Sequence, residues 1–94
     1  MNIYVIENYV NRLTKDDIRR FALKQGITLG NDEVAFIYTY IKKNYKNIIF
    51  GNLNDVLSDI KDDVKANTYN KIVNLYMQYK DKLELLAKTI RENS

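Results

Sequence analysis

Residues 68–92 of the chain are TYNKIVNLYMQYKDKLELLAKTIRE, and their apolar spacing is the clearest pattern in the sequence. The apolar positions follow one another at alternating steps of 3 and 4 residues, which is a heptad pattern. They are Tyr69, Ile72, Tyr76, Tyr79, Leu83, Leu86 and Ile90. An α-helix brings residues at these spacings onto one face. The stretch therefore predicts one long helix, opened by Asn67 or Thr68.

This helix is long for the size of the chain. At 1.5 Å per residue it spans roughly 37 Å, whereas a compact body of 94 residues has a radius of gyration of about 12 Å. We therefore expect residues 80–94, approximately, to form a helical arm that projects from a smaller body. Its exposed seam predicts self-association of the chain as a homo-oligomer, through Tyr79, Leu83, Leu86 and Ile90.

The first half of the chain also has a helical pattern. Pro is absent, and apolar residues recur at three- and four-residue steps, which predicts helices throughout. The first helix is expected over residues 3–12, with one apolar face. That face carries Val5, Ile6, Tyr9, Val10 and Leu13.

The second helix has local start and stop signals. Thr14 and Asp17 have the spacing of a capping box, in which each side chain accepts a hydrogen bond from the other residue's backbone N–H. Gly26 is the expected stop, because Gly adopts the left-handed C-cap conformation without steric cost.

The third helix opens at Gly30 or Asn31 and is apolar around most of its circumference. Such a helix is typically central in a core, although the stripe of Phe36 and Tyr40 could instead be a partner surface. Asn52 then caps the fourth helix.

Together these patterns predict an all-α fold: a compact bundle of five helices in a single domain, 1–94. The apolar segments 27–29 and 48–50 leave open a minimal extended pair between them. The expected core consists of Val10, Ile18, Phe21, Ile37, Ile41, Val56, Ile60, Ile72 and Tyr76.

Composition argues against an enzyme. Neither Cys nor His is present, so thiol nucleophiles, zinc–thiolate sites and the commonest general base are all missing. We identify no catalytic, cofactor-binding or metal-binding residue, and expect no cofactor. Four aspartates at helical spacing are interpreted as a solvated face, since carboxylates along one helix cannot converge on one ion. They are Asp55, Asp59, Asp62 and Asp63.

The chain carries 15 basic and 12 acidic residues, and the excess of +3 lies entirely before residue 51. A basic face contacting phosphates would bind nucleic acid or another polyanion in a salt-sensitive way. Its candidate residues are Arg12, Arg19, Arg20, Lys24, Lys42, Lys43 and Lys46. Tyr45 beside this set would stack a base or, as the simpler alternative, pack in the core.

Codon bias is the competing explanation for the charge, because Asn, Lys, Ile and Tyr are abundant and all have AT-rich codons.

Residues 13–41 also resemble the SAP module, a helix–extended–helix element that binds DNA. The shared positions, from Ile18 to Val34, are mostly packing and turn residues.

Residues 8–80 resemble the uncharacterised YqfT-like family of short proteins from bacilli. The resemblance rests on Thr14-x-x-Asp17, Phe21-Ala22, residues 26–29 (GITL), residues 48–50 (IIF) and residues 68–75. It implies an all-helical fold and a bacterial cytoplasmic origin, and it supplies no functional residues.

A cytoplasmic location is also expected because the sequence has no targeting segment and no apolar stretch long enough to cross a membrane. The leading function is a non-catalytic protein–protein interaction module that binds itself or another protein. The alternatives are a polyanion-binding protein and an immunity- or antitoxin-like helical inhibitor. We expect no membrane partner and no small-molecule substrate.

Overall fold

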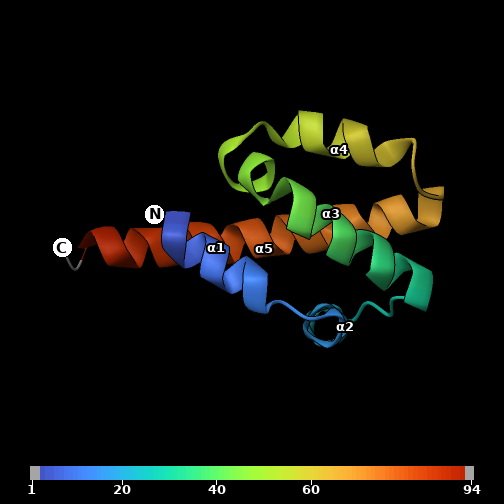
Figure 1. The fold of residues 1–94 in the computed structure, drawn as a ribbon, viewed down its shortest axis with the longest axis horizontal. Helices are drawn as coiled ribbons and strands as arrows, with labels where there is room; N and C mark the ends of the chain where they lie inside the picture. The colour runs from blue at the N-terminus through green and yellow to red at the C-terminus, as the bar shows by residue number, and fades with distance from the viewer. Residues whose placement is uncertain (1–2, 93–94) are drawn as a thin grey trace.

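The computed structural model describes the backbone of residues 3–92, together with the side chains of that range apart from Ile3, Leu53 and residues 82–92. Five α-helices follow one another, and no strand occurs among the described residues (Figure 1). The helices are α1 (Ile3–Arg12), α2 (Lys15–Lys24), α3 (Asn31–Phe50), α4 (Leu53–Lys61) and α5 (Ala66–Glu92). The predicted all-α fold, with five helices and a long last one, is confirmed.

Hydrogen bonds explain where α2 begins and ends. The Thr14 N–H donates to the Asp17 carboxylate at 2.9 Å, and the Asp17 N–H donates to the Thr14 hydroxyl at 3.1 Å. These bonds form the predicted capping box, and they hold the pKa of Asp17 below its ordinary value. At the other end Gly26 has a φ of 77°, and the Ile27 N–H returns to the Ala22 carbonyl at 2.9 Å. The predicted stop at Gly26 is therefore confirmed.

α3 is a kinked helix. Asn44 leaves helical geometry (φ −123°, ψ 15°), and its side-chain amide donates to the Tyr40 carbonyl at 3.1 Å. Beyond the kink the chain continues as helix to Phe50 in a new direction (Figure 1). The extended pair considered for residues 27–29 and 48–50 is therefore wrong. The straight part of α3, about 20 Å long, separates the two segments, and residues 48–50 are helical and not extended.

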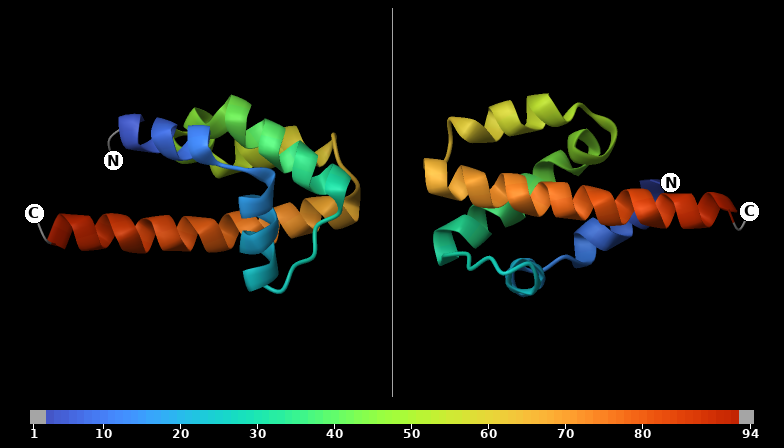
Figure 2. Two further views of the ribbon diagram at one scale, coloured as in Figure 1. Left: turned by 60° about the horizontal axis from the view of Figure 1, so that its bottom comes forward. Right: turned by 180° about the vertical axis from the view of Figure 1, so that it is seen from behind.

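The helices pack around α3. α3 lies close to α1, α2 and α4, whereas the close neighbour of α5 is α4. Figure 2 shows α5 running along the length of the molecule; in the left-hand view α1, α3 and α4 lie above it and α2 crosses it. Its 27 residues span about 40 Å, and the longest dimension of the molecule is 43 Å. The C-terminal end of α5 reaches past the start of α1 (Figure 1).

The buried core differs in part from the expected one. The buried apolar residues are Ile6, Val10, Ile18, Ala22, Val34, Val56, Ile60, Ile72 and Leu75. Five of the nine expected core residues are among them: Val10, Ile18, Val56, Ile60 and Ile72. The other four are only half-buried, namely Phe21, Ile37, Ile41 and Tyr76. As described below, these four line a cavity.

α3 occupies the centre of the fold. Val34 is fully buried, and Phe36 and Tyr40 pack against the cluster that Val56 and Ile60 form with α5. The Phe36 and Tyr40 rings also stack, with centroids 6.1 Å apart. The two aromatic residues therefore belong to the core and not to a separate partner surface.

Candidate interaction site

The first part of the heptad face of α5 is used within the chain. Ile72 is buried, and Tyr69 and Tyr76 pack against the core cluster. Tyr79 contacts Phe21 of α2 edge to face, with ring centroids 5.8 Å apart. Burial raises the pKa of Tyr79, and the neighbouring Tyr9 hydroxyl adds to the effect. Tyr79, the first of the four predicted self-association residues, therefore already packs against other residues of the same chain.

The remaining three predicted seam residues lie in the C-terminal part of α5. The side chains of Leu83, Leu86 and Ile90 are outside the described residues. The helical backbone that carries them is described, and it runs opposite α1 (Figure 2). The surface that α1 presents to this part of α5 is therefore the best-placed candidate for an interaction.

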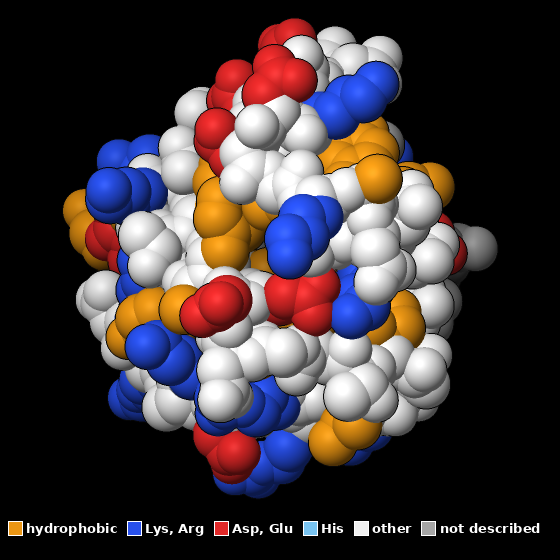
Figure 3. Space-filling view, turned by 90° about the vertical axis from the view of Figure 1, so that its right-hand side faces the viewer, with side chains coloured by type: hydrophobic (Ala, Val, Ile, Leu, Met, Phe, Trp, Pro, Cys, Tyr) orange, Lys and Arg blue, Asp and Glu red, His pale blue; other side chains and the backbone are white. Residues whose placement is uncertain are grey.

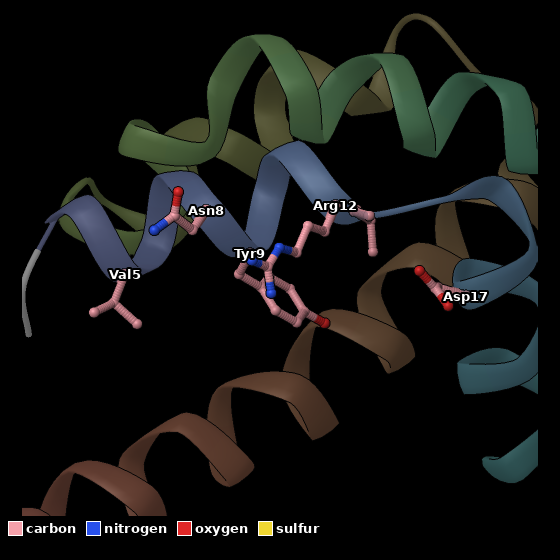
Figure 4. A pocket seen from close by; sticks show the side chains of 6 residues that line it. Val5, Asn8, Tyr9, Arg12 and Asp17 are labelled. Atoms are coloured by element: carbon pink, nitrogen blue, oxygen red, sulfur yellow. The ribbon is translucent and has the colours of Figure 1, made fainter.

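α1 presents an exposed apolar face on that side. The exposed fractions are 62% for Val5 and 54% for Tyr9, and these residues lie one turn apart. A cleft of about 500 Å³ runs along them, and Figure 4 shows Tyr9 reaching from α1 towards α5. The cleft is lined by Val5, Asn8, Tyr9, Arg12, Leu13 and Asp17.

The apolar face expected on α1 is only partly buried. Val10 is buried, as expected of a core residue, and so is Ile6; Leu13 is half-buried, and Val5 and Tyr9 are exposed. α1 packs against α3, and this contact uses only part of the apolar face of α1. The rest of the apolar face is left for the cleft.

Two side chains of α3 fix α1 in this position. The Lys42 ammonium donates to the carbonyls of Val10 and Asn11, at 2.5 and 3.2 Å. It thereby satisfies carbonyls that the end of α1 leaves without helical partners. The Tyr45 hydroxyl donates to the Glu7 carboxylate at 3.0 Å. Burial and this hydrogen bond raise the pKa of Tyr45.

The seven candidate basic residues do not form one free cationic face. Arg20 forms an ion pair with Asp16 on the same helix, and Arg19 donates to the Asn31 side chain at 3.1 Å. Lys42 is engaged by α1, as described above. The other four are exposed: Arg12, Lys24, Lys43 and Lys46. On the face shown in Figure 3, blue basic and red acidic side chains are interspersed.

Tyr45 was considered as a base-stacking residue. Its hydroxyl is held by Glu7, and the Lys46 ammonium lies 6.0 Å from its ring centroid. Tyr45 is half-buried and connects α3 to α1, which agrees with the packing interpretation.

Glu33 joins the start of α3 to the start of α5, a contact that the sequence pattern did not indicate. Its carboxylate accepts from the Gly30 N–H at 2.8 Å, from the Thr68 hydroxyl at 2.5 Å and from the Lys71 ammonium at 2.9 Å. These donors, Thr68 first, lower the pKa of Glu33 to about 2. The Gly30–Glu33 spacing indicates a helix start. The sequence around Glu33 does not indicate its contacts with Thr68 and Lys71, which lie 35 and 38 positions further along the chain.

A cavity of about 370 Å³ lies between the helices, and residues of all five helices line it. Its described lining is almost entirely apolar. Val5, Tyr9 and Leu13 line both this cavity and the cleft beside α1, so the two spaces meet there. The four half-buried core residues named above are all in its wall.

The cavity is partly open, so its apolar wall can be reached by water. An occupant that brings apolar atoms into this space would remove that wall from water and so stabilise the fold.

Among the described residues we identify no metal site and no membrane-spanning helix. Within the described residues, no three acidic side chains are grouped as a metal site would require. The aspartates of the α4 region, Asp55, Asp59, Asp62 and Asp63, are all exposed. No described helix combines the length and apolar character needed to cross a membrane.

Comparison with known proteins finds no matching family model, no similar curated protein and no similar solved structure. The resemblance to the YqfT-like family stays a prediction that rests on the residues quoted for it.

Proposed function

We propose that this protein is a non-catalytic interaction module that associates with a second copy of itself, through α5 and the exposed face of α1. The observation that carries the proposal is the apolar cleft on α1, which faces the part of α5 where the heptad continues. Val5 and Tyr9 supply apolar surface, and Leu83, Leu86 and Ile90 continue the heptad in the sequence.

Surface area supports a protein partner. The chain exposes 6746 Å², whereas a compact monomer of 11.1 kDa exposes about 5,700 Å². The excess of about 1,100 Å² exceeds the roughly 800 Å² that each partner buries in a standard interface.

A second copy fits because the chain carries both halves of the contact. In a two-fold dimer, the α5 seam of each copy can meet the α1 face of the other, so the same contact forms twice. Covering Val5 and Tyr9 in both copies would remove apolar surface from water, which favours association by about 25 cal/mol per Å² before the cost of association is subtracted.

Sedimentation velocity from micromolar to millimolar concentration tests the proposal. We expect a monomer–dimer equilibrium that Val5→Glu and Leu86→Glu each shift towards monomer, because both place a charge in the contact. Leu23→Glu is the matched control, since Leu23 is 61% exposed on α2 and outside the cleft. Circular dichroism of each variant shows whether its helices are intact.

A chain that stays monomeric over the whole range would refute the proposal. Equal weakening by Val5→Glu and Leu23→Glu would also refute it, because it would mean that association does not depend on the α1 face.

A further inference from the structure

The self-association proposed above involves only the mouth of the cavity, at Val5 and Tyr9. Residues of all five helices line the cavity, and it reaches Val56 and Ile60 of α4 and Ile72 of α5, which are among the most buried residues described. Because these residues form the core cluster, an occupant would sit within the core and not on the surface.

The volume of the cavity suits a small molecule. It measures about 370 Å³, within the range of about 300–1,000 Å³ that small-molecule pockets occupy. A second copy can cover the mouth beside α1 while a small molecule occupies the interior.

Two tyrosine hydroxyls in the cavity wall are already hydrogen-bonded within the chain. The Tyr76 hydroxyl donates to the Ile48 carbonyl at 3.0 Å, and the Tyr45 hydroxyl is taken by Glu7. No described buried side-chain nitrogen or oxygen lacks a hydrogen-bond partner. The wall therefore does not demand a polar occupant.

The charge of the cavity wall narrows the choice of ligand further. Asp17 is the one charged residue among the described residues of the wall, and its carboxylate already accepts from the Thr14 N–H. It lies where the cavity meets the cleft, since it lines both. An anionic ligand would meet this carboxylate and gain no cation in the described wall, so an uncharged ligand is favoured.

We propose that the cavity binds one small, uncharged, mainly apolar molecule, which enters beside Val5 and Tyr9 of α1. A cavity of 150 Å³ holds benzene, so the present volume corresponds to roughly 15 non-hydrogen atoms, the size of a two- or three-ring aromatic or a medium-length neutral aliphatic. Pockets of this volume with mostly apolar walls are typical of small-molecule sites.

A matched pair of fluorescent probes tests the proposal. N-phenylnaphthylamine is uncharged, and anilinonaphthalene sulfonate has the same aromatic body with an added negative charge. We expect the neutral probe to bind the wild-type chain with one site per chain, to raise its melting temperature, and to bind at least tenfold more tightly than the sulfonate.

Two substitutions locate the site. Ile41→Phe places extra atoms in the cavity, because Ile41 is a half-buried wall residue, and it should weaken neutral-probe binding at least tenfold. Leu23→Phe is the control with the same new side chain on an exposed position outside the wall, and it should leave binding unchanged. Ile41→Ala, which enlarges the cavity, should retain binding and guards against misfolding of the Phe variant.

The proposal is overturned if the wild-type chain shows no saturable binding of the neutral probe. Equal affinity for the two probes, or equal affinity of the Ile41→Phe and wild-type chains, also overturns it, because a surface patch would explain both. The titration is made at concentrations below and above any dimerisation. Loss of probe binding on dimerisation would assign the space to the partner chain and would refute a small-molecule site, while the sedimentation result would stand.

Discussion

Glu33→Gln tests the main polar connection between α3 and α5. The substitution keeps the size of the side chain but removes the charge that accepts hydrogen bonds from Gly30, Thr68 and Lys71. The pKa of Glu33 is lowered from 4.5 to about 2. At about 1.4 kcal/mol per pKa unit, this shift corresponds to at most about 3 kcal/mol of stability.

The expected effect at neutral pH is smaller than this limit. The Glu33 and Lys71 side chains are 16% and 26% exposed, so water screens part of the interaction. We expect Glu33→Gln to lower the free energy of unfolding by about 1–2 kcal/mol at pH 7.

The lowered pKa of Glu33 fixes the direction in which stability changes with pH. Between about pH 4.5 and 2 the unfolded chain binds a proton at Glu33 and the folded chain does not, so this contribution to stability falls as the pH falls. The difference between wild type and Glu33→Gln should be complete above pH 4.5 and should shrink towards pH 2.

Urea denaturation followed by circular dichroism, at pH 7 and at steps down to pH 2, measures this difference. Asp32→Asn is the matched control, because Asp32 lies in the same first turn of α3 but is exposed. It loses the same favourable interaction with the helix dipole without losing a contact to α5. Equal stability of Glu33→Gln and Asp32→Asn at pH 7, or a difference that does not change with pH, would refute the reasoning.

Three further predictions address other features. Lys42→Met should lower the free energy of unfolding by about 1–2 kcal/mol, because it removes charge-assisted hydrogen bonds to the end of α1. Lys43→Met, at an exposed position, is the control and should change the free energy of unfolding by less than about 0.5 kcal/mol. Thermal unfolding compares the two variants. Gly26→Ala should lower the free energy of unfolding by about 1–2 kcal/mol, because φ is 77° at this position and a residue with a Cβ is strained there. No atom lies close enough to clash with the added Cβ, so the backbone strain is the whole effect. An unchanged midpoint in urea denaturation would contradict this. The affinity for duplex DNA, measured by fluorescence anisotropy, should vary with log salt with a slope no steeper than about −4. The reason is that only four of the seven candidate cations are exposed without an ion pair or hydrogen bond that holds them to another described residue. A steeper slope would favour a polyanion-binding function over self-association.

Much of the fold followed from local patterns. Thr14 and Asp17 placed the start of α2, and Gly26 placed its end, because each signal acts through hydrogen bonds within one helical turn. The heptad from Tyr69 onwards likewise placed α5. The extended pair failed because β-prone residues 48–50 continue a helix that the sequence does not visibly interrupt, and the kink at Asn44 has no clear local signal.

The candidate site was predicted less completely than the fold. Spacing correctly placed Val5 and Tyr9 on one apolar face of α1 with Ile6, but it could not show that α3 covers only part of that face. The basic residues were identified by their type, whereas their availability depends on neighbours such as Asp16 and Asn31. Lys42 illustrates the difference, because it caps a helix 31 and 32 positions earlier in the chain.

The sequence by itself determined the helical class, the two ends of α2 and the apolar face of each helix. These properties depend on interactions within a few residues, which repeat at the period of the helix. The tertiary structure alone decided that Glu33 holds α5, that the face of α1 stays partly exposed and that a cavity lies between the helices. Those features depend on the distances and angles at which helices pack, and these are set by all the side chains at each contact together.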